Sequence, residues 1–149
     1  MPVSPDVRRQ IAAWLRPGRI VLLNTQFAPH EKFVIVAHVS ASDGVWGFLI
    51  NSEIHPFVAS RPRLLACQVS IDVADHLNFL DYDSYADCSE VKDAISLQDV
   101  YTQLAAEKSR MKGHLSRDEV NRVRAAVQIA PKISVAQREI ILAALPVQP

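Results

Sequence analysis

The sequence contains few glycines, few cysteines and no long apolar run. Its four glycines are scattered over 149 residues, which excludes a glycine-rich phosphate-binding loop or a dinucleotide-binding fingerprint. No apolar stretch approaches the roughly 18 residues that span a bilayer, and the N-terminal residues lack the apolar core of a secretion signal. We therefore expect a cytoplasmic protein with no membrane partner.

The two cysteines, Cys67 and Cys88, have neither Cys-x-x-Cys spacing nor a companion histidine at zinc-finger spacing. Neither a redox motif nor a structural metal site is predicted, and no cofactor is expected. Both side chains are interpreted as buried thiols. The acidic neighbours Asp87 and Glu90 should raise the thiol pKa of Cys88, which argues against a reactive thiolate.

Neither sign of charge is in excess, because 16 basic residues balance 16 acidic ones. The net charge therefore gives no reason to expect nucleic acid or an acidic membrane as a partner. The distribution is uneven: residues 72–93 carry seven acidic side chains against one basic one, whereas residues 107–149 carry eight basic against four acidic. These regions are either solvated faces that neutralise each other or partner surfaces, with residues 72–93 suited to a basic protein.

What the sequence does contain is a set of short β-branched and aromatic runs separated by turn-forming segments such as residues 41–44. Many of these runs are apolar at consecutive positions, which is typical of strands covered on both faces. Strands are predicted at residues 19–24, 32–40, 45–52 and 63–71, and two further extended segments at 77–80 and 85–91 around a polar turn.

Apolar residues at helical spacing occupy both ends of the chain. The first such segment follows a Ser4 cap, and Pro17 and Gly18 end it. Serine caps precede the segments near the other end as well, and Ser116 with Glu119 three residues later predicts a capping box. Helices are predicted at residues 5–16, 96–111, 116–130 and 134–145.

The order of these elements predicts the fold class. Strands come before the C-terminal helices with no β-α-β alternation, which favours an α+β fold built on an antiparallel sheet. The length suits one domain over residues 1–149. We expect a small antiparallel β-barrel core at residues 17–95, an N-terminal helix and a helical extension at residues 96–145.

Four runs, PGRIVLLN, HEKFVIVAHVS, VWGFLINS and DYDSYADCSEV, resemble successive strand landmarks of the PemK/MazF-like toxins. The resemblance covers about residues 17–95 and implies an SH3-like β-barrel that cleaves RNA without a metal. The chain is divergent, because Lys32 and Phe33 stand where the family has Arg-Pro, and Asn51 and Ser52 stand where it has Thr-Ser. The helical C-terminal region goes beyond the minimal toxin.

The resemblance implies a metal-independent endoribonuclease acting on single-stranded RNA, or a degenerate relative, with an antitoxin-like protein as partner. In that family an arginine stabilises charge on the phosphate and a hydroxyl residue assists attack by the 2′-hydroxyl. By position, these catalytic roles fall to Lys32 and Ser52. Lysine supplies the charge without the bidentate fork of arginine. Further substrate contacts are expected from Arg19, Asn51, His55, Arg61 and Arg63.

The alternative function is a non-catalytic protein- or nucleic-acid-binding module with a barrel fold. Lys32 is then an ordinary edge charge and Ser52 a residue that ends a strand. Asp81 and Asp83 have no third ligand at calcium-loop spacing, so no metal site is predicted. A homodimer is a further expectation, formed through the apolar residues Ile133, Ile140, Ile141 and Leu142.

Overall fold

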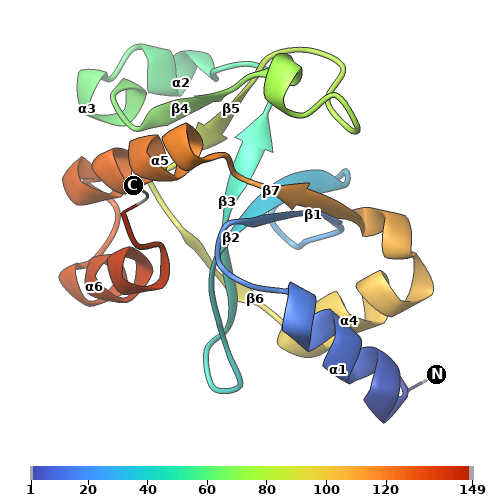
Figure 1. Ribbon diagram of the computed structural model, residues 1–149. Helices are drawn as coiled ribbons and strands as arrows, with labels where there is room; N and C mark the ends of the chain where they lie inside the picture. The colour runs from blue at the N-terminus through green and yellow to red at the C-terminus, as the bar shows by residue number, and fades with distance from the viewer. Residues whose placement is uncertain (1, 148–149) are drawn as a thin grey trace.

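The computed structural model describes residues 2–147 and has an α+β fold, in which an antiparallel sheet curls into a half-barrel with helices around it (Figure 1). This confirms the fold class predicted from the order of the runs. The strands are β1 (Arg19–Leu23), β2 (Lys32–Ser40), β3 (Gly44–Asn51), β4 (Gln68–Ile71), β5 (Ser84–Asp87), β6 (Lys92–Ile95) and β7 (Met111–His114). The helices are α1 (Pro5–Trp14), α2 (Pro56–Ala59), α3 (Pro62–Leu65), α4 (Leu97–Ala106), α5 (Arg117–Ile129) and α6 (Val135–Ala144), with 3₁₀ turns η1 (Val73–Asp75) and η2 (Lys108–Arg110).

Strand β3 is the centre of the sheet. The strand order is β4-β5-β3-β2-β1-β7, and β6 pairs with β3 beside this path. One edge of β3 therefore pairs with β2, while its other edge pairs with β6 near Val45 and with β5 near Ile50. Gly47 of β3 pairs with Val36 of β2, and a side chain there would collide with Val34 and crowd the backbone of Ile35. The close approach of the two strands thus requires glycine.

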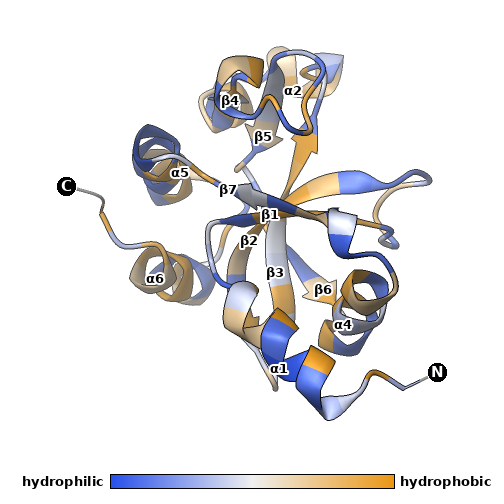
Figure 2. Ribbon diagram, turned by 45° about the vertical axis from the view of Figure 1, so that its right-hand side comes forward, coloured by the Kyte–Doolittle hydropathy of each residue, from blue (hydrophilic) through white to orange (hydrophobic). Residues whose placement is uncertain are grey.

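The sheet is covered on both faces, as the consecutive apolar positions predicted. On one face, α5 and α6 pack Val123 and Ile141 against Phe48 of β3. On the other face, α1 and α4 pack against β1 and β2, with Leu104 in the same cluster as Val21. Figure 1 shows these two helix pairs on opposite sides of the sheet, and Figure 2 shows hydrophilic residues on the side of α5 turned away from it.

Serine caps begin the four longer helices at the positions that the sequence predicts. Ser4, Ser96, Ser116 and Ser134 each accept a hydrogen bond from a backbone N–H of the first turn. Such a cap stabilises a helix by about 1 kcal/mol, because it satisfies a donor that the helix itself leaves free. The helices expected at residues 5–16, 116–130 and 134–145 are therefore confirmed, with ends that differ by one or two residues.

Four secondary-structure predictions were wrong in detail. Residues 62–65 form α3 instead of the start of a strand, because Pro62 occupies the first helical turn. Residues 77–80 form a turn instead of an extended segment. Pairing with β3 occurs at residues 84–87 and 92–95 instead of 85–91.

The fourth error concerns the helix expected at residues 96–111. Helix α4 ends at Ala106. Strand β7, at the edge of the sheet next to β1, takes up Met111 from the end of the expected helix and residues 112–114 from the expected connection. Only four residues long and containing Gly113, β7 carries no alternating apolar pattern that would predict a strand. Among residues 2–147, no helix has the length and apolar character needed to cross a membrane.

Candidate functional site

The structure brings Lys32, Asn51 and Ser52 together. Lys32 opens β2 and Asn51 closes β3, and because these strands are antiparallel neighbours the two residues meet at one end of the sheet. The Lys32 ammonium Nζ donates a hydrogen bond of 2.6 Å to Asn51 Oδ1. Ser52 follows directly and is exposed. The pairing of these strands places side chains 19 positions apart at one site.

A cavity of about 370 Å³ lies beside this cluster and is lined by both Lys32 and Ser52. Its aromatic wall consists of Phe33, Phe79 and Tyr82. The rings of Phe33 and Phe79 pack with their centroids 4.9 Å apart, and Tyr82 is 60% exposed. The cavity therefore combines a cation, a hydroxyl group and aromatic surface, and its volume falls in the range of small-ligand sites.

The charges in this cavity are nearly balanced. His30, Glu31, Lys32 and Asp81 line it. The Glu31 carboxylate accepts a hydrogen bond of 2.6 Å from Arg110, so its charge is neutralised. The Asp81 carboxylate is exposed and remains, with the His30 imidazole, as a group able to exchange protons in the cavity.

Burial lowers the pKa of Lys32 from its usual value of 10.5. The cause is loss of hydration, which disfavours the charged ammonium form. The ammonium donates to Asn51 Oδ1, an amide oxygen with no formal charge that would offset this loss. The ammonium group is thus held in place by a neutral acceptor and keeps two N–H donors for an anionic group.

A buried histidine–carboxylate contact supports the wall of the cavity, and no pattern in the sequence predicts it. His76 Nε2 lies 2.8 and 3.0 Å from the two carboxylate oxygens of Glu119, and both side chains are buried. The Glu119 Oε1 atom also accepts the backbone N–H of Ser116 in the capping box of α5. The backbone carbonyl of His76 in turn accepts from Phe79 and Leu80. The pair therefore ties the loop that carries the aromatic wall to helix α5.

Glu119 was identified in the sequence only as a capping-box residue. The capping role is confirmed, but the same carboxylate also bonds a histidine 43 positions earlier. Residues so far apart in the sequence share no helical or strand periodicity, so the contact between His76 and Glu119 is visible only in the tertiary structure.

Three other predicted substrate residues, on or next to the short helices α2 and α3, make contacts that do not involve Lys32. His55 caps α2, where its Nδ1 accepts the backbone N–H of Phe57 at 3.0 Å. Arg61 lies over the Phe57 ring at 3.4 Å and donates to the Phe57 carbonyl oxygen. Arg63 is exposed on α3. None of these three residues lines the cavity beside Lys32.

Arg19 lies at the opposite end of β1 from the partner of Lys32. Leu23 pairs with Lys32, whereas Arg19 pairs with His114 of β7. Four residues of strand separate the two ends by about 13 Å. Arg19 belongs to a different cavity, so the structure divides the predicted substrate residues between two places.

Much of the acidic segment at residues 72–93 serves local structure. Asp83 accepts the backbone N–H of Val73, and Asp87 accepts from Gln68 and Ser89. Glu90 and Asp93 likewise bond Lys92 and Gln137. Because these carboxylates already accept hydrogen bonds within the chain, fewer of them are available to bind a basic partner.

The basic C-terminal region is also used internally. Arg138 donates to the carbonyl oxygens of Val127, Ala130 and Ile133, where α5 ends. Arg124 donates to two carbonyl oxygens at the end of α6. Both guanidinium groups therefore satisfy carbonyls that the helices leave unpaired.

Cys67 and Cys88 are both buried free thiols, as predicted. The pKa of Cys88 is raised well above 9.0, first by burial and then by the charge of Asp87. The predicted direction is confirmed, but the main cause is burial and not the acidic neighbours. Among residues 2–147, no group of three or more His, Cys, Asp and Glu side chains is placed to hold a metal ion.

Comparisons with family models, with curated proteins and with solved structures found no match to this chain.

Proposed function

We propose that the chain is a divergent PemK/MazF-like endoribonuclease that acts on single-stranded RNA at the cavity beside Lys32. The observation that carries the proposal is that Lys32 and Ser52 line one cavity together with exposed aromatic surface. These are the two positions to which the resemblance assigns the catalytic roles. The proposal includes a cytoplasmic location and a toxin-like role with a partner that restrains it.

The chemistry follows from the groups in the cavity. The 2′-hydroxyl oxygen of a bound nucleotide attacks the adjacent phosphorus, and the bond from phosphorus to the 5′-oxygen of the next nucleotide breaks. Lys32 stabilises the negative charge that develops on the phosphoryl oxygens, and the hydroxyl of Ser52 holds the attacking 2′-hydroxyl. The carboxylate of Asp81 accepts the proton from that hydroxyl, and His30, in its imidazolium form, gives a proton to the leaving oxygen and becomes neutral. The products are a 2′,3′-cyclic phosphate and a 5′-hydroxyl end, and no water is consumed.

The aromatic wall suits a single-stranded substrate. Bases stack on aromatic side chains with a free energy of about 1–3 kcal/mol for each base, whereas bases in a duplex are already stacked on each other. Tyr82 has the exposed surface needed for such a contact. The wall therefore favours unpaired RNA over duplex RNA.

The test is cleavage of a long single-stranded RNA, with and without EDTA, by the wild type and by Lys32→Ala. We expect cleavage that resists the chelator and falls at least about 100-fold in the variant, the usual loss when one charge-stabilising donor is removed. Arg63→Ala is the matched control, because it removes a basic residue outside the cavity and should retain activity. Unchanged cleavage in Lys32→Ala would overturn the assignment of Lys32.

A non-catalytic nucleic-acid-binding module is the second candidate function. It is favoured by the Lys32–Asn51 bond, because a lysine held by one amide offers a point charge and not the bidentate fork that binds two phosphate oxygens. RNA that stays intact but binds with an affinity dependent on Lys32 would establish this second function.

A further inference from the structure

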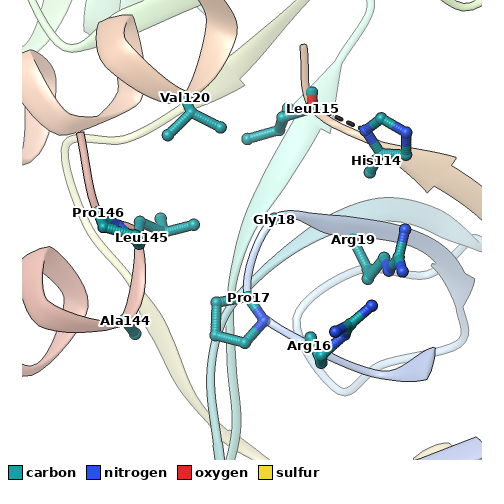
Figure 3. Close-up of a pocket in the computed structure, with 10 residues that line it drawn as sticks. All are labelled: Arg16, Pro17, Gly18, Arg19, His114, Leu115, Val120, Ala144, Leu145 and Pro146. Atoms are coloured by element: carbon teal, nitrogen blue, oxygen red, sulfur yellow. Dashed lines mark hydrogen bonds between the residues drawn. The ribbon is translucent and has the colours of Figure 1, made fainter. Parts of the chain in front are cut away.

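A second cavity, of about 420 Å³, lies at the other end of β1 and carries three basic side chains (Figure 3). Arg16 precedes β1, Arg19 is the first residue of β1, and His114 is the last residue of β7 and pairs with Arg19. No acidic side chain lines this cavity. It is therefore electrostatically different from the nearly neutral cavity beside Lys32.

The positive charges of this cavity are not compensated by ion pairs. None of the ion pairs within residues 2–147 involves Arg16, Arg19 or His114. Figure 3 shows the Arg16 and Arg19 side chains extending from the same turn, on the side where the His114 ring lies. Two guanidinium groups close together repel each other, and an anion between them removes this repulsion. The arrangement favours a ligand with more than one negative charge.

Two of the three basic groups are held in place by the protein. Arg19 Nε donates to the Trp14 carbonyl oxygen at 3.0 Å, and its guanidinium lies 5.2 Å from the centre of the Trp14 ring. Both terminal nitrogens of Arg19 stay available to a ligand. His114 Nδ1 donates to the Leu115 carbonyl oxygen at 3.0 Å, which leaves Nε2 as the atom that can contact a ligand. Fixed donors lose little entropy when they bind.

The opposite wall of the cavity is apolar. It consists of Pro17, Leu115, Val120 and Leu145, of which Figure 3 shows Val120 and Leu145 on the side away from the two arginines. Hydrogen bonds fix this wall: Leu115 N–H donates to the Gly18 carbonyl oxygen at 2.8 Å. Gly18 has a φ of 93°, which only glycine adopts without strain, so the turn that places the arginines depends on it. The cavity thus has one cationic and one apolar side.

We propose that this cavity binds a small phosphate monoester whose organic part is apolar or aromatic. Guanidinium groups match phosphate oxygens in pairs, and a phosphate monoester carries the double charge that two arginines can balance. The apolar wall accounts for the organic part, and the volume suits a ligand of that size. This inference is independent of RNA cleavage, because no residue of the cavity beside Lys32 takes part.

The test is calorimetric titration of the full chain with phenyl phosphate, inorganic phosphate and benzoate. Phenyl phosphate should bind most tightly, since only this probe offers both a dianionic phosphate and an apolar ring. Arg16→Gln should weaken its binding about tenfold, the usual loss for one charge-assisted contact of about 1.4 kcal/mol. Arg16→Lys should recover part of that loss, because lysine restores the charge but not the paired donors.

Two control variants show whether the loss of affinity is specific to this cavity. Arg9→Gln removes the same charge from the exposed face of α1, outside the cavity, and should change the affinity less than twofold. Lys32→Ala should also leave the affinity unchanged, so that failure of the RNA cleavage proposal and of this one are distinguishable.

Four outcomes would overturn the proposal. They are no saturable binding of phenyl phosphate, an equal loss of affinity in Arg9→Gln, tighter binding of benzoate than of phenyl phosphate, and a site that binds single-stranded RNA through Arg16 while ignoring the small probes. Saturable binding of phenyl phosphate that is lost in Arg16→Gln and kept in both controls would establish the site.

Discussion

At the scale of single residues, the most consequential feature of the proposed active site is that its cation is a lysine, Lys32, and not an arginine. Lys32 is half-buried and hydrogen-bonded to Asn51 Oδ1. Arginine stays charged at every accessible pH, whereas a buried lysine is more easily deprotonated. The proposed cleavage should therefore depend on pH in a way that an arginine enzyme would not.

The pH dependence can be predicted in sign. Burial lowers the pKa of Lys32 below its usual 10.5. Because the charged form stabilises the transition state, kcat/KM should fall as pH rises through a value below 10.5, after subtraction of the RNA hydrolysis that occurs without protein. Lys32→Arg should remove the part of this alkaline decline that comes from the lysine and keep at least as much activity at neutral pH. An identical alkaline decline in wild type and Lys32→Arg would show that another group is responsible.

At the scale of secondary-structure elements, the sequence predicted the helices and central strands well and the short edge elements poorly. Serine caps and apolar spacing act locally, so Ser116 and Ser134 marked the starts of α5 and α6. Strand β7 has no such local signal, because its position depends on pairing with β1, which lies far earlier in the chain. The same limit applies to β6, which forms only because β3 offers part of its edge.

The candidate site shows the same division between local and long-range information. Lys32 and Ser52 could be selected because each lies at a strand end, where the resemblance also places a function. The sequence could not predict that Arg19, Arg61 and Arg63 lie outside the cavity of Lys32 and Ser52. Their positions depend on strand register and on the short helices α2 and α3. The loop of residues 76–83, which supplies the aromatic wall, is fixed by a contact with α5 that no periodicity encodes.

That contact leads to a prediction about stability. Glu119→Ala removes the carboxylate that bonds His76 and leaves the buried imidazole without its partner. A buried polar group that loses its hydrogen-bond partner typically costs about 1–3 kcal/mol. We expect a reduction of that size in the free energy of unfolding, measured by urea denaturation. The neighbouring Asp118→Ala, at an exposed position in the same helical turn, should cost less than about 1 kcal/mol. Equal effects of both variants would contradict a stabilising role of the pair.

At the scale of the whole molecule, several charged side chains are hydrogen-bonded to groups of the same chain. Arg124 and Arg138 cap helix ends, and Asp83 and Asp87 accept hydrogen bonds from groups of the same chain. The apolar residues expected to form a dimer surface are also used within the chain. Ile133 and Ile141 are buried in the core, and of the four expected residues only Ile140 is exposed. A homodimer therefore stays a prediction that would need another surface.

This internal use of charge predicts a weak dependence of RNA binding on salt. The net charge is zero, and Lys32 is the one lysine or arginine that lines the proposed cleavage site. If one or two phosphates are neutralised, the slope of log K against log salt concentration should be about −1, at roughly −0.7 for each phosphate on a single strand. Fluorescence anisotropy with a labelled RNA at several salt concentrations measures it. A slope steeper than about −4 would indicate a broad basic surface and contradict the proposed site.

The central claim is that the cavity beside Lys32 cleaves RNA through attack by the 2′-hydroxyl. It is tested most directly with two matched single-stranded oligonucleotides, one all RNA and one with a single 2′-deoxy residue at the mapped cleavage position. We predict that the first is cut to a 2′,3′-cyclic phosphate and a 5′-hydroxyl end, identified by mass spectrometry, and that the second is not cut at that position. Cleavage of the deoxy-substituted strand at the same position, or no cleavage of either strand, would contradict the proposed mechanism.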